Sequence, residues 1–328
     1  MKRPISVMAG LTVAAVVVAA CSSGADSSSS ENASGTTKIT VGTSPSIVNL
    51  SLYEALKDGG AMASHGLDAT AEVVTSGAQA VPLLLNGQLQ FSAADPVGVI
   101  AAIANGVPLE IVAVGPTASA DPATDIAPLL VKDSSGLGDT GSAYSGKTIA
   151  VNALNAISGL AVKSAIDSTG GDSSKVRFIE MPIPQMSEAI AGGTVDGGVT
   201  SEPYVAKGEN SGLKTGLPAF SSGIPDLPTV VYITSKQYAA KNPQIVASFA
   251  EAMIEANTSL TANPDQARTL LESTTSVPLT PSELEAVIMP VFDPPTVDVA
   301  GLDRLSELMI KYGQLKKPQS LSDNVFNS

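Results

Sequence analysis

Residues 189–203 read AIAGGTVDGGVTSEP: a helix-like start, a glycine turn, a strand with few large side chains, and an acidic residue directly before a proline. An earlier stretch, LLNGQLQFSAADP at residues 84–96, has a similar arrangement and places Asp95 before Pro96. Proline suits the first turn of a helix, so each stretch predicts a strand that leads directly into a helix. Because Asp95 and Glu202 hold equivalent places, we expect the chain to contain two similar halves.

Outward from these stretches, strand-like and helix-like segments alternate along the chain. Strands that alternate with helices of about 8–12 residues indicate βαβ units and mostly parallel sheets. We expect the chain to cross to its second half near residues 127–133 and to return near 229–235. The region from Pro243 to Phe326 is mainly helix-like, and we expect it to pack back on the first half. The clearest strands are predicted at 38–42, 89–95, 109–115, 147–152 and 229–235.

Length and composition narrow the class of protein. At 328 residues the chain can bury one large or two medium cores. Its 44% apolar and 15% charged residues are ordinary for a folded protein. A formal charge of −13, no tryptophan and no basic patch argue against binding to nucleic acid.

The N-terminus has the features of a secretory signal. Lys2 and Arg3 precede an apolar run from Val7 to Ala20 that ends in VAAC, and Cys21 is the only cysteine. The run is short for a membrane span, which needs about 20 apolar residues. It resembles a bacterial lipobox, which implies lipidation of Cys21; an ordinary secretory peptide with a stray cysteine is the alternative. Residues 1–20 are thus expected to be a signal peptide and residues 21–37 a lipidated cysteine with a flexible tether.

Motifs that would indicate an enzyme or a cofactor do not fit their context. GSAYSGKT at 141–148 matches a P-loop and GLGDTG at 136–141 a dinucleotide pattern, but neither opens a helix. His65 is the only histidine, so a site built from several His or Cys ligands cannot form. We therefore expect no cofactor and no metal. A hydrolase that uses Asp95 with Glu202 across a cleft stays open as an alternative.

The order and spacing of several segments resemble a known family. GTSPS, HGLDATAEVVTSGAQAV, LLLNGQLQFSAAD, NGVPLEIVAVG and AIAGGTVDGGVTSEPY follow one another between about Lys38 and Phe326. This succession is similar to that of the extracytoplasmic solute-binding proteins of ABC importers, in the group that takes nitrate, sulfonates, taurine and thiamine precursors. The resemblance implies an α/β, two-lobed type II periplasmic-binding-protein-like fold. In it, helices flank a mostly parallel sheet in each lobe, and a cleft separates the lobes. Lobe 1 would comprise residues 38–130 and 232–328, and lobe 2 residues 131–231.

The resemblance also implies a function. The chain would be no enzyme but a monomer anchored through Cys21 to the extracytoplasmic face of a bacterial cell membrane. It would close on a small molecule, with the crossovers as hinge, and deliver it to a permease that works with an ATPase. A relative that makes a thiamine pyrimidine uses a cysteine cluster, which this sequence lacks. Two alternatives stay open: a secreted lipoprotein enzyme (a hydrolase or a degenerate pyrimidine-synthase relative), and a sensor or adhesin domain.

Candidate ligand contacts follow from the predicted strand ends, because ligands of open α/β sheets bind at the carboxyl ends of strands. Asp95 could instead serve only as a helix N-cap, whereas Glu is a poorer cap, so we expect Glu202 to face the cleft with Tyr204 as a wall. Arginine is scarce, so a sulfonate or taurine-like zwitterion, or a heterocycle, suits the site better than bare nitrate. The predicted contacts are Ser44, Pro45, Ser76, Gly77, Ala94, Asp95, Asn152, Ile157, Ser158, Glu202, Tyr204 and Tyr232.

Overall fold

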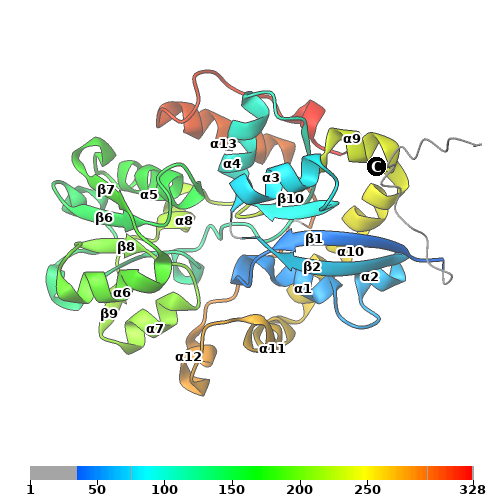
Figure 1. The fold of residues 1–328 in the computed structure, drawn as a ribbon. Coiled ribbons are helices and arrows are strands. Elements are labelled where there is room, and N and C mark those ends of the chain that lie inside the picture. Colours follow the sequence, from blue (N-terminus) through cyan, green and yellow to red (C-terminus); the bar gives the residue numbers. More distant parts are fainter. Residues whose placement is uncertain (1–34, 75, 294, 327–328) are drawn as a thin grey trace, which may run out of the picture.

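The computed structural model describes residues 35–74, 76–293 and 295–326, which form two sheets of five strands, each flanked by helices (Figure 1). The strand order is β2-β1-β3-β10-β4 in the first sheet and β7-β6-β8-β5-β9 in the second. The first sheet contains β1 (Thr37–Thr43), β2 (Leu67–Val73), β3 (Phe91–Ala94), β4 (Leu109–Val114) and β10 (Val231–Ser235). The second contains β5 (Leu129–Lys132), β6 (Thr148–Val151), β7 (Arg177–Glu180), β8 (Gly197–Val199) and β9 (Leu213–Thr215).

Helices connect the strands within each half. The first half contains the 3₁₀ helix η1 (Ile47–Asn49) and the helices α1 (Leu50–Ala55), α2 (Ala61–Ser64), α3 (Gly77–Leu85), α4 (Pro96–Ala104), α9 (Lys236–Lys241) and α10 (Pro243–Ala262). The second contains α5 (Ile157–Ser168), α6 (Ile183–Gly192), α7 (Tyr204–Asn210) and α8 (Ala219–Gly223). The tail contains α11 (Pro264–Thr274), α12 (Pro281–Ala286) and α13 (Val299–Lys311). Over the described ranges, no helix is both long and apolar enough to span a bilayer.

Both sheets are mixed, with one reversed strand in the same place. In the first sheet β1 is parallel to β2 and β3, whereas β10 is antiparallel to β3 and β4. In the second, β6 is parallel to β7 and β8, whereas β5 is antiparallel to β8 and β9. Each reversed strand is the first that the chain adds after leaving the other sheet. Residues 127–133, predicted as a crossover, therefore include strand β5, and the crossing itself lies before Leu129.

The scarcity of large side chains in β8 follows from its neighbours. β8 lies between β6 and β5. A Cβ atom added to Gly197 would come within 2.5 Å of Leu129 Cδ2 and 2.9 Å of the Leu130 carbonyl oxygen. Both distances are shorter than Cβ contacts in folded proteins allow. Strand β8 therefore needs glycine at this position, where it pairs with β5.

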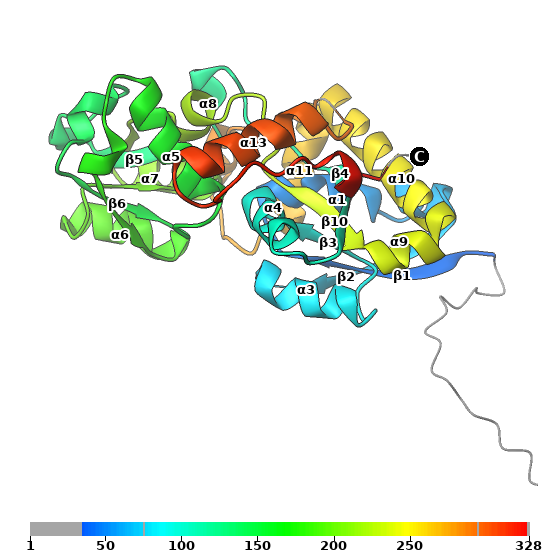
Figure 2. The same ribbon diagram turned by 90° about the horizontal axis from the view of Figure 1, so that it is seen from above.

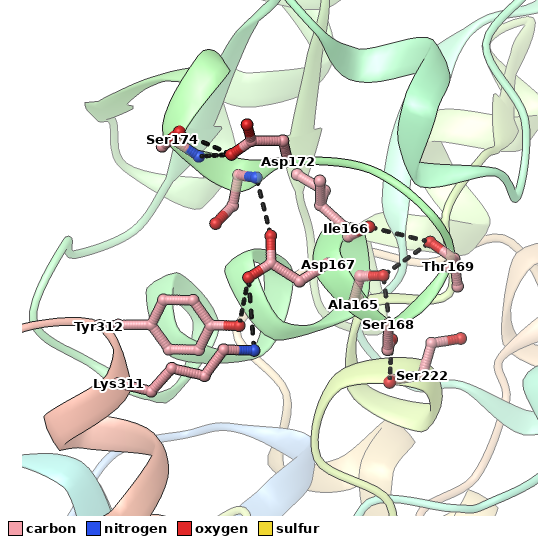
Figure 3. A network of polar contacts seen from close by, with 11 residues as sticks. Ala165, Ile166, Asp167, Ser168, Thr169, Asp172, Ser174, Ser222, Lys311 and Tyr312 are labelled. Carbon is pink, nitrogen blue, oxygen red and sulfur yellow. Dashed lines mark hydrogen bonds and ion pairs between the residues drawn. The ribbon is translucent and has the colours of Figure 1, made fainter.

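The helical tail, which we expected to pack on the first half, contacts both halves. α12 packs against α7, and α13 packs against both α4 and α5. Figure 2 shows α13 lying across the molecule from one half to the other. Just past α13, the Tyr312 hydroxyl donates to Asp167 Oδ2 at 2.9 Å (Figure 3) and Gln314 Nε2 donates to the Leu154 carbonyl at 3.1 Å. The largest core cluster accordingly includes side chains from both sheets, such as Ile111 and Ile149.

Candidate functional site

A cavity with a volume of about 610 Å³ lies between the two halves. Its lining is almost uncharged and mixes Ser, Thr and Asn side chains with a somewhat larger number of apolar residues. The first half contributes Thr43, Ser44, Ser46, Val48, Asn49, Val74, Ser76, Gly77, Ala93, Ala94, Asp95 and Gly98. The second contributes Asn152, Ala153, Asn155, Ala156, Ile157, Ser158, Ile183, Val199, Ser201 and Phe220. The two crossovers contribute Ile126, Ala127, Thr229 and Val230.

Strand ends of both sheets supply much of this lining. Ser44 follows β1 directly, Asp95 follows β3, and Asn152 follows β6. Ser201 stands two residues after β8, the strand of the second sheet that corresponds to β3. The carboxyl ends of both sheets therefore face the same space, which is where open α/β sheets bind ligands.

Helix N-termini also reach the cavity. α3 begins at Gly77 after Ser76, whose hydroxyl accepts from Gln79 N at 3.3 Å. α5 begins at Ile157 after Ala156, which has no side chain that could cap it. The first N–H groups of a helix lack partners within the helix and carry partial positive charge, so both ends attract hydrogen-bond acceptors.

Asp95 joins the two halves across the cavity. Its Oδ1 accepts from Val97 N at 2.9 Å and from Gly98 N at 3.1 Å, and so caps α4. Its Oδ2 accepts from Ile157 N, at the start of α5, at 3.0 Å. Burial raises the pKa of the Asp95 carboxyl, while these three hydrogen bonds act in the opposite direction. Asp95 is thus the N-cap that the sequence allowed and, in addition, a contact between the halves.

Asparagine side chains place further polar groups on the walls. The Ser158 hydroxyl donates to Asn152 Oδ1. Asn49 Nδ2 donates to the Ser44 carbonyl at 2.9 Å. Asn49 Oδ1 has no hydrogen-bond partner among the described residues, although Asn49 is only 3% exposed. Because an unpaired buried acceptor is costly, a hydrogen-bond donor from a ligand would stabilise this wall.

The structure brings eight of the twelve predicted contacts together and leaves four out. The eight that line the cavity are Ser44, Ser76, Gly77, Ala94, Asp95, Asn152, Ile157 and Ser158. The four outside its lining are Pro45, Glu202, Tyr204 and Tyr232. The predicted lipidation site Cys21 lies outside the described residues.

Glu202 and Tyr232 lie elsewhere for different reasons. Glu202 is 2% exposed and faces away from the cavity, because Oε1 accepts from Ile288 N at 3.0 Å and Oε2 from Ala206 N at 3.2 Å. Tyr232 is fully buried on the face of the first sheet that packs against α10, where its ring lies 6.1 Å from that of Phe249. The cavity is therefore built without the glutamate that the sequence placed in it.

Several lining residues were absent from the prediction. Asn49 belongs to η1, Ser46 precedes it, Gly98 belongs to the first turn of α4, and Asn155 to the loop before α5. Each follows a strand within six residues, so a search of the whole segment after every strand would have included them. Thr229 lies in the second crossover before β10, where such a search would not look.

The described lining contains one ionisable side chain, Asp95, and no Lys, Arg or His. No group of three or more His, Cys, Asp or Glu residues suited to a metal ion occurs within the described ranges.

Comparisons with known proteins agree with this architecture. A search of curated proteins found no match. The periplasmic aliphatic sulphonate binding protein SsuA from Escherichia coli superposes with a TM-score of 0.69 at 17% identity, over 88% of this chain and 97% of that one. SsuA from Xanthomonas axonopodis pv. citri, an alkanesulfonate-binding protein bound to MOPS, gives a TM-score of 0.67 at 16% identity, over 89% of this chain and 98% of that one. The periplasmic nitrate-binding protein NrtA from Synechocystis PCC 6803 gives a TM-score of 0.69 at 14% identity, over 88% of this chain and 84% of that one.

These structural likenesses identify the fold as that of the two-lobed periplasmic binding proteins. The family is identified by sequence, because the model of the family described as NMT1/THI5 like matches residues 55–267, well over half of the chain. The chain therefore belongs to the NMT1/THI5-like family.

Proposed function

We propose that this chain is the solute-binding component of an ABC importer and that it binds rather than transforms its ligand. The ligand is a small polar molecule, a sulfonate or taurine-like zwitterion or a heterocycle, which a membrane permease with its ATPase receives. The observation that carries the proposal is the cavity of about 610 Å³ with walls from both halves. Ligand pockets commonly measure about 300–1,000 Å³, so this cavity has room for a small molecule.

The proposed mechanism is hinge closure. The halves, residues 38–130 with 232–328 and residues 131–231, would approach each other by bending near residues 128–133 and 228–235. A ligand that contacts both walls binds the closed form more tightly than the open form and so shifts the population toward closure. Asp95 and Ile157, which meet across the cavity, mark the place where the two walls come together.

The proposed location is the extracytoplasmic face of a bacterial cell membrane, where the protein acts as a monomer held by a lipid on Cys21. The support is the N-terminal sequence: a basic start, a short apolar run and VAAC at residues 18–21. Metabolic labelling of the producing cells with a radioactive fatty acid tests the anchor. Loss of label in Cys21→Ser is expected, and label retained by this variant would contradict the anchor.

Filling the cavity tests the binding site. Gly98 lines the cavity in the first turn of α4, and an added Cβ atom there would meet no atom within 4 Å. We expect Gly98→Leu to leave the fold intact and to abolish the thermal shift that a ligand panel of sulfonates, taurine, nitrate, pyrimidines and carboxylates gives the wild type. At a hundredfold excess over its Kd, a bound ligand stabilises the folded protein by about 2.7 kcal/mol.

Gly192→Leu is the matched control. Gly192 is also a helical glycine with free space around an added Cβ atom, but it lies on α6 outside the cavity. This variant should respond to ligands as the wild type does. Equal ligand responses from both leucine variants would show that the ligand binds elsewhere, and turnover of a panel compound would show that the chain is an enzyme.

A further inference from the structure

We infer that Asp95 sets the charge preference of the cavity by occupying the N-terminus of α5, so that the cleft favours a ligand presenting N–H donors over an anion. This inference rests on the proposed function and narrows its ligand class to neutral or cationic molecules that carry an amine or another N–H group. It assigns to Asp95 the role of a specificity-determining residue.

The first observation is that Asp95 caps two helices of different halves. The start of α5 has an alanine at its N-cap position, which leaves the first N–H groups of the helix without a side-chain acceptor. Asp95 Oδ2 supplies that acceptor from the other half, 3.0 Å from Ile157 N. A carboxylate already stands where an anionic group of a ligand would otherwise bind a helix N-terminus.

The second observation is the distribution of charge around the cavity. Asp95 is the only ionisable side chain of the described lining, which contains no Lys, Arg or His. An anionic ligand near α5 would either displace Asp95 from Ile157 N or lie beside its negative charge. Each choice costs binding free energy, because the first breaks a charge-assisted hydrogen bond and the second places like charges together.

The third observation is independent of Asp95 and concerns a hydrogen-bond acceptor in the cavity wall that lacks a donor. Asn49 Nδ2 is turned to Ser44, donating to its carbonyl at 2.9 Å and lying 3.4 Å from its hydroxyl oxygen. Asn49 Oδ1 is left without a partner among the described residues, on a side chain that lines the cavity and is 3% exposed. An N–H or O–H group can pair with this solvent-shielded oxygen, whereas a sulfonate or nitrate oxygen cannot.

Three probes separate amine from anion recognition: 3-morpholinopropan-1-ol, which carries the ring amine of MOPS without the sulfonate; 1-propanesulfonate, which carries the sulfonate without the amine; and MOPS itself. Isothermal titration calorimetry of the full-length protein measures each Kd. We expect 3-morpholinopropan-1-ol to bind at least about tenfold more tightly than propanesulfonate, the factor that one charge-assisted contact supplies. Propanesulfonate binding as tightly or more tightly would overturn the inference and leave the proposed function standing.

The variant Asp95→Asn keeps an N-cap for α4, because Asn caps a helix about as well as Asp, but removes the negative charge. We expect its preference for the amine probe to fall by at least about tenfold, with propanesulfonate gaining affinity. Asp298→Asn, at the N-cap of α13 and outside the cavity, is the matched control and should keep the wild-type ranking. An unchanged ranking in a folded Asp95→Asn protein would overturn the inference. Lack of saturable binding across the wider ligand panel would instead count against the proposed function.

Discussion

The Glu202 carboxyl group lies between the start of α7 and the chain after α12, and it joins the second half to the tail. Its two oxygens accept from Ala206 N and Ile288 N. Burial raises the pKa of Glu202 to about 7, against the opposing effect of these two hydrogen bonds. The side chain that the sequence suggested as a ligand contact thus connects two segments of the chain, and its burial favours the neutral carboxylic acid.

This proton makes stability depend on pH. The folded protein keeps Glu202 protonated up to about pH 7, whereas the unfolded chain releases the proton near pH 4.5. Between these values the unfolded chain binds fewer protons, so the free energy of unfolding falls as pH rises, by up to about 3 kcal/mol. Glu202→Gln should flatten this fall, as measured by urea unfolding at pH 5, 6 and 7. The exposed Glu188→Gln on α6 should keep the wild-type slope, and a wild-type slope in Glu202→Gln would contradict the prediction.

At the scale of elements, α13 is attached to α5 by a cluster of polar groups around Asp167 (Figure 3). Asp167 accepts from Tyr312 and from Ser173 N at 2.8 Å, and Lys311 Nζ lies 3.4 Å from Oδ2. Partial burial raises the pKa of Asp167, but the hydrogen bonds from Ser173, Tyr312 and Lys311 outweigh it and lower the pKa overall. Asp167 is thus held as a carboxylate at a helix–helix contact between the second half and the tail.

Removing the Tyr312 hydroxyl should loosen this contact. We expect Tyr312→Phe to lower the free energy of unfolding by about 1 kcal/mol, the usual net value of one such hydrogen bond. A double-mutant cycle with Asp167→Ala, which removes the acceptor, should give a coupling energy of at least about 0.5 kcal/mol. Ser174→Ala removes a hydroxyl that bonds Asp172 within one exposed turn, and it should cost less. Additive effects of Tyr312→Phe and Asp167→Ala would contradict a direct interaction.

At the scale of the whole molecule, the tail forms a third connection between the halves, beside the two crossovers. It leaves the first half after α11 and contacts α7, where Asn210 Nδ2 donates to Glu283 Oε1 at 3.1 Å. It then passes the first crossover, where Thr117 N donates to the Val291 carbonyl at 2.8 Å. After α13 it returns to the first sheet, where Phe326 N donates to the Ile111 carbonyl at 2.9 Å. A tail attached at both ends restricts how far the halves can separate.

Lengthening the tail should therefore let the two halves of the ligand-free protein move farther apart. We expect four Gly/Ser residues inserted between the exposed Lys316 and Lys317 to increase the radius of gyration in X-ray scattering without ligand and to weaken ligand binding, because the open form gains population. The same insertion between Asp58 and Gly59, a turn within the first half, should change neither. Equal effects from both insertions would show that the tail does not restrict opening.

The sequence predicted the alternation of strands and helices because the segments near β1, β3, β4 and β10 are strongly β-branched or apolar and bounded by turn residues. It could not predict which face of a strand buried on both sides meets the cavity, so Tyr232 was assigned to the cleft. Nor could it pair Glu202 with Ile288, which lies 86 positions along the chain. Asp95 was predictable as a helix cap from its neighbours, but its bond to Ile157 N comes from the other half.

The two reversed strands determine the order in which the sheets can be completed during synthesis. All strands of the second sheet lie between Leu129 and Thr215, an uninterrupted part of the chain. The first sheet needs β10, and β4 has sheet partners only at residues 231–235 and Val325 within the described ranges. A growing chain therefore carries β4 without a neighbour while more than a hundred further residues are made. The half that is encoded first is the half that is finished last.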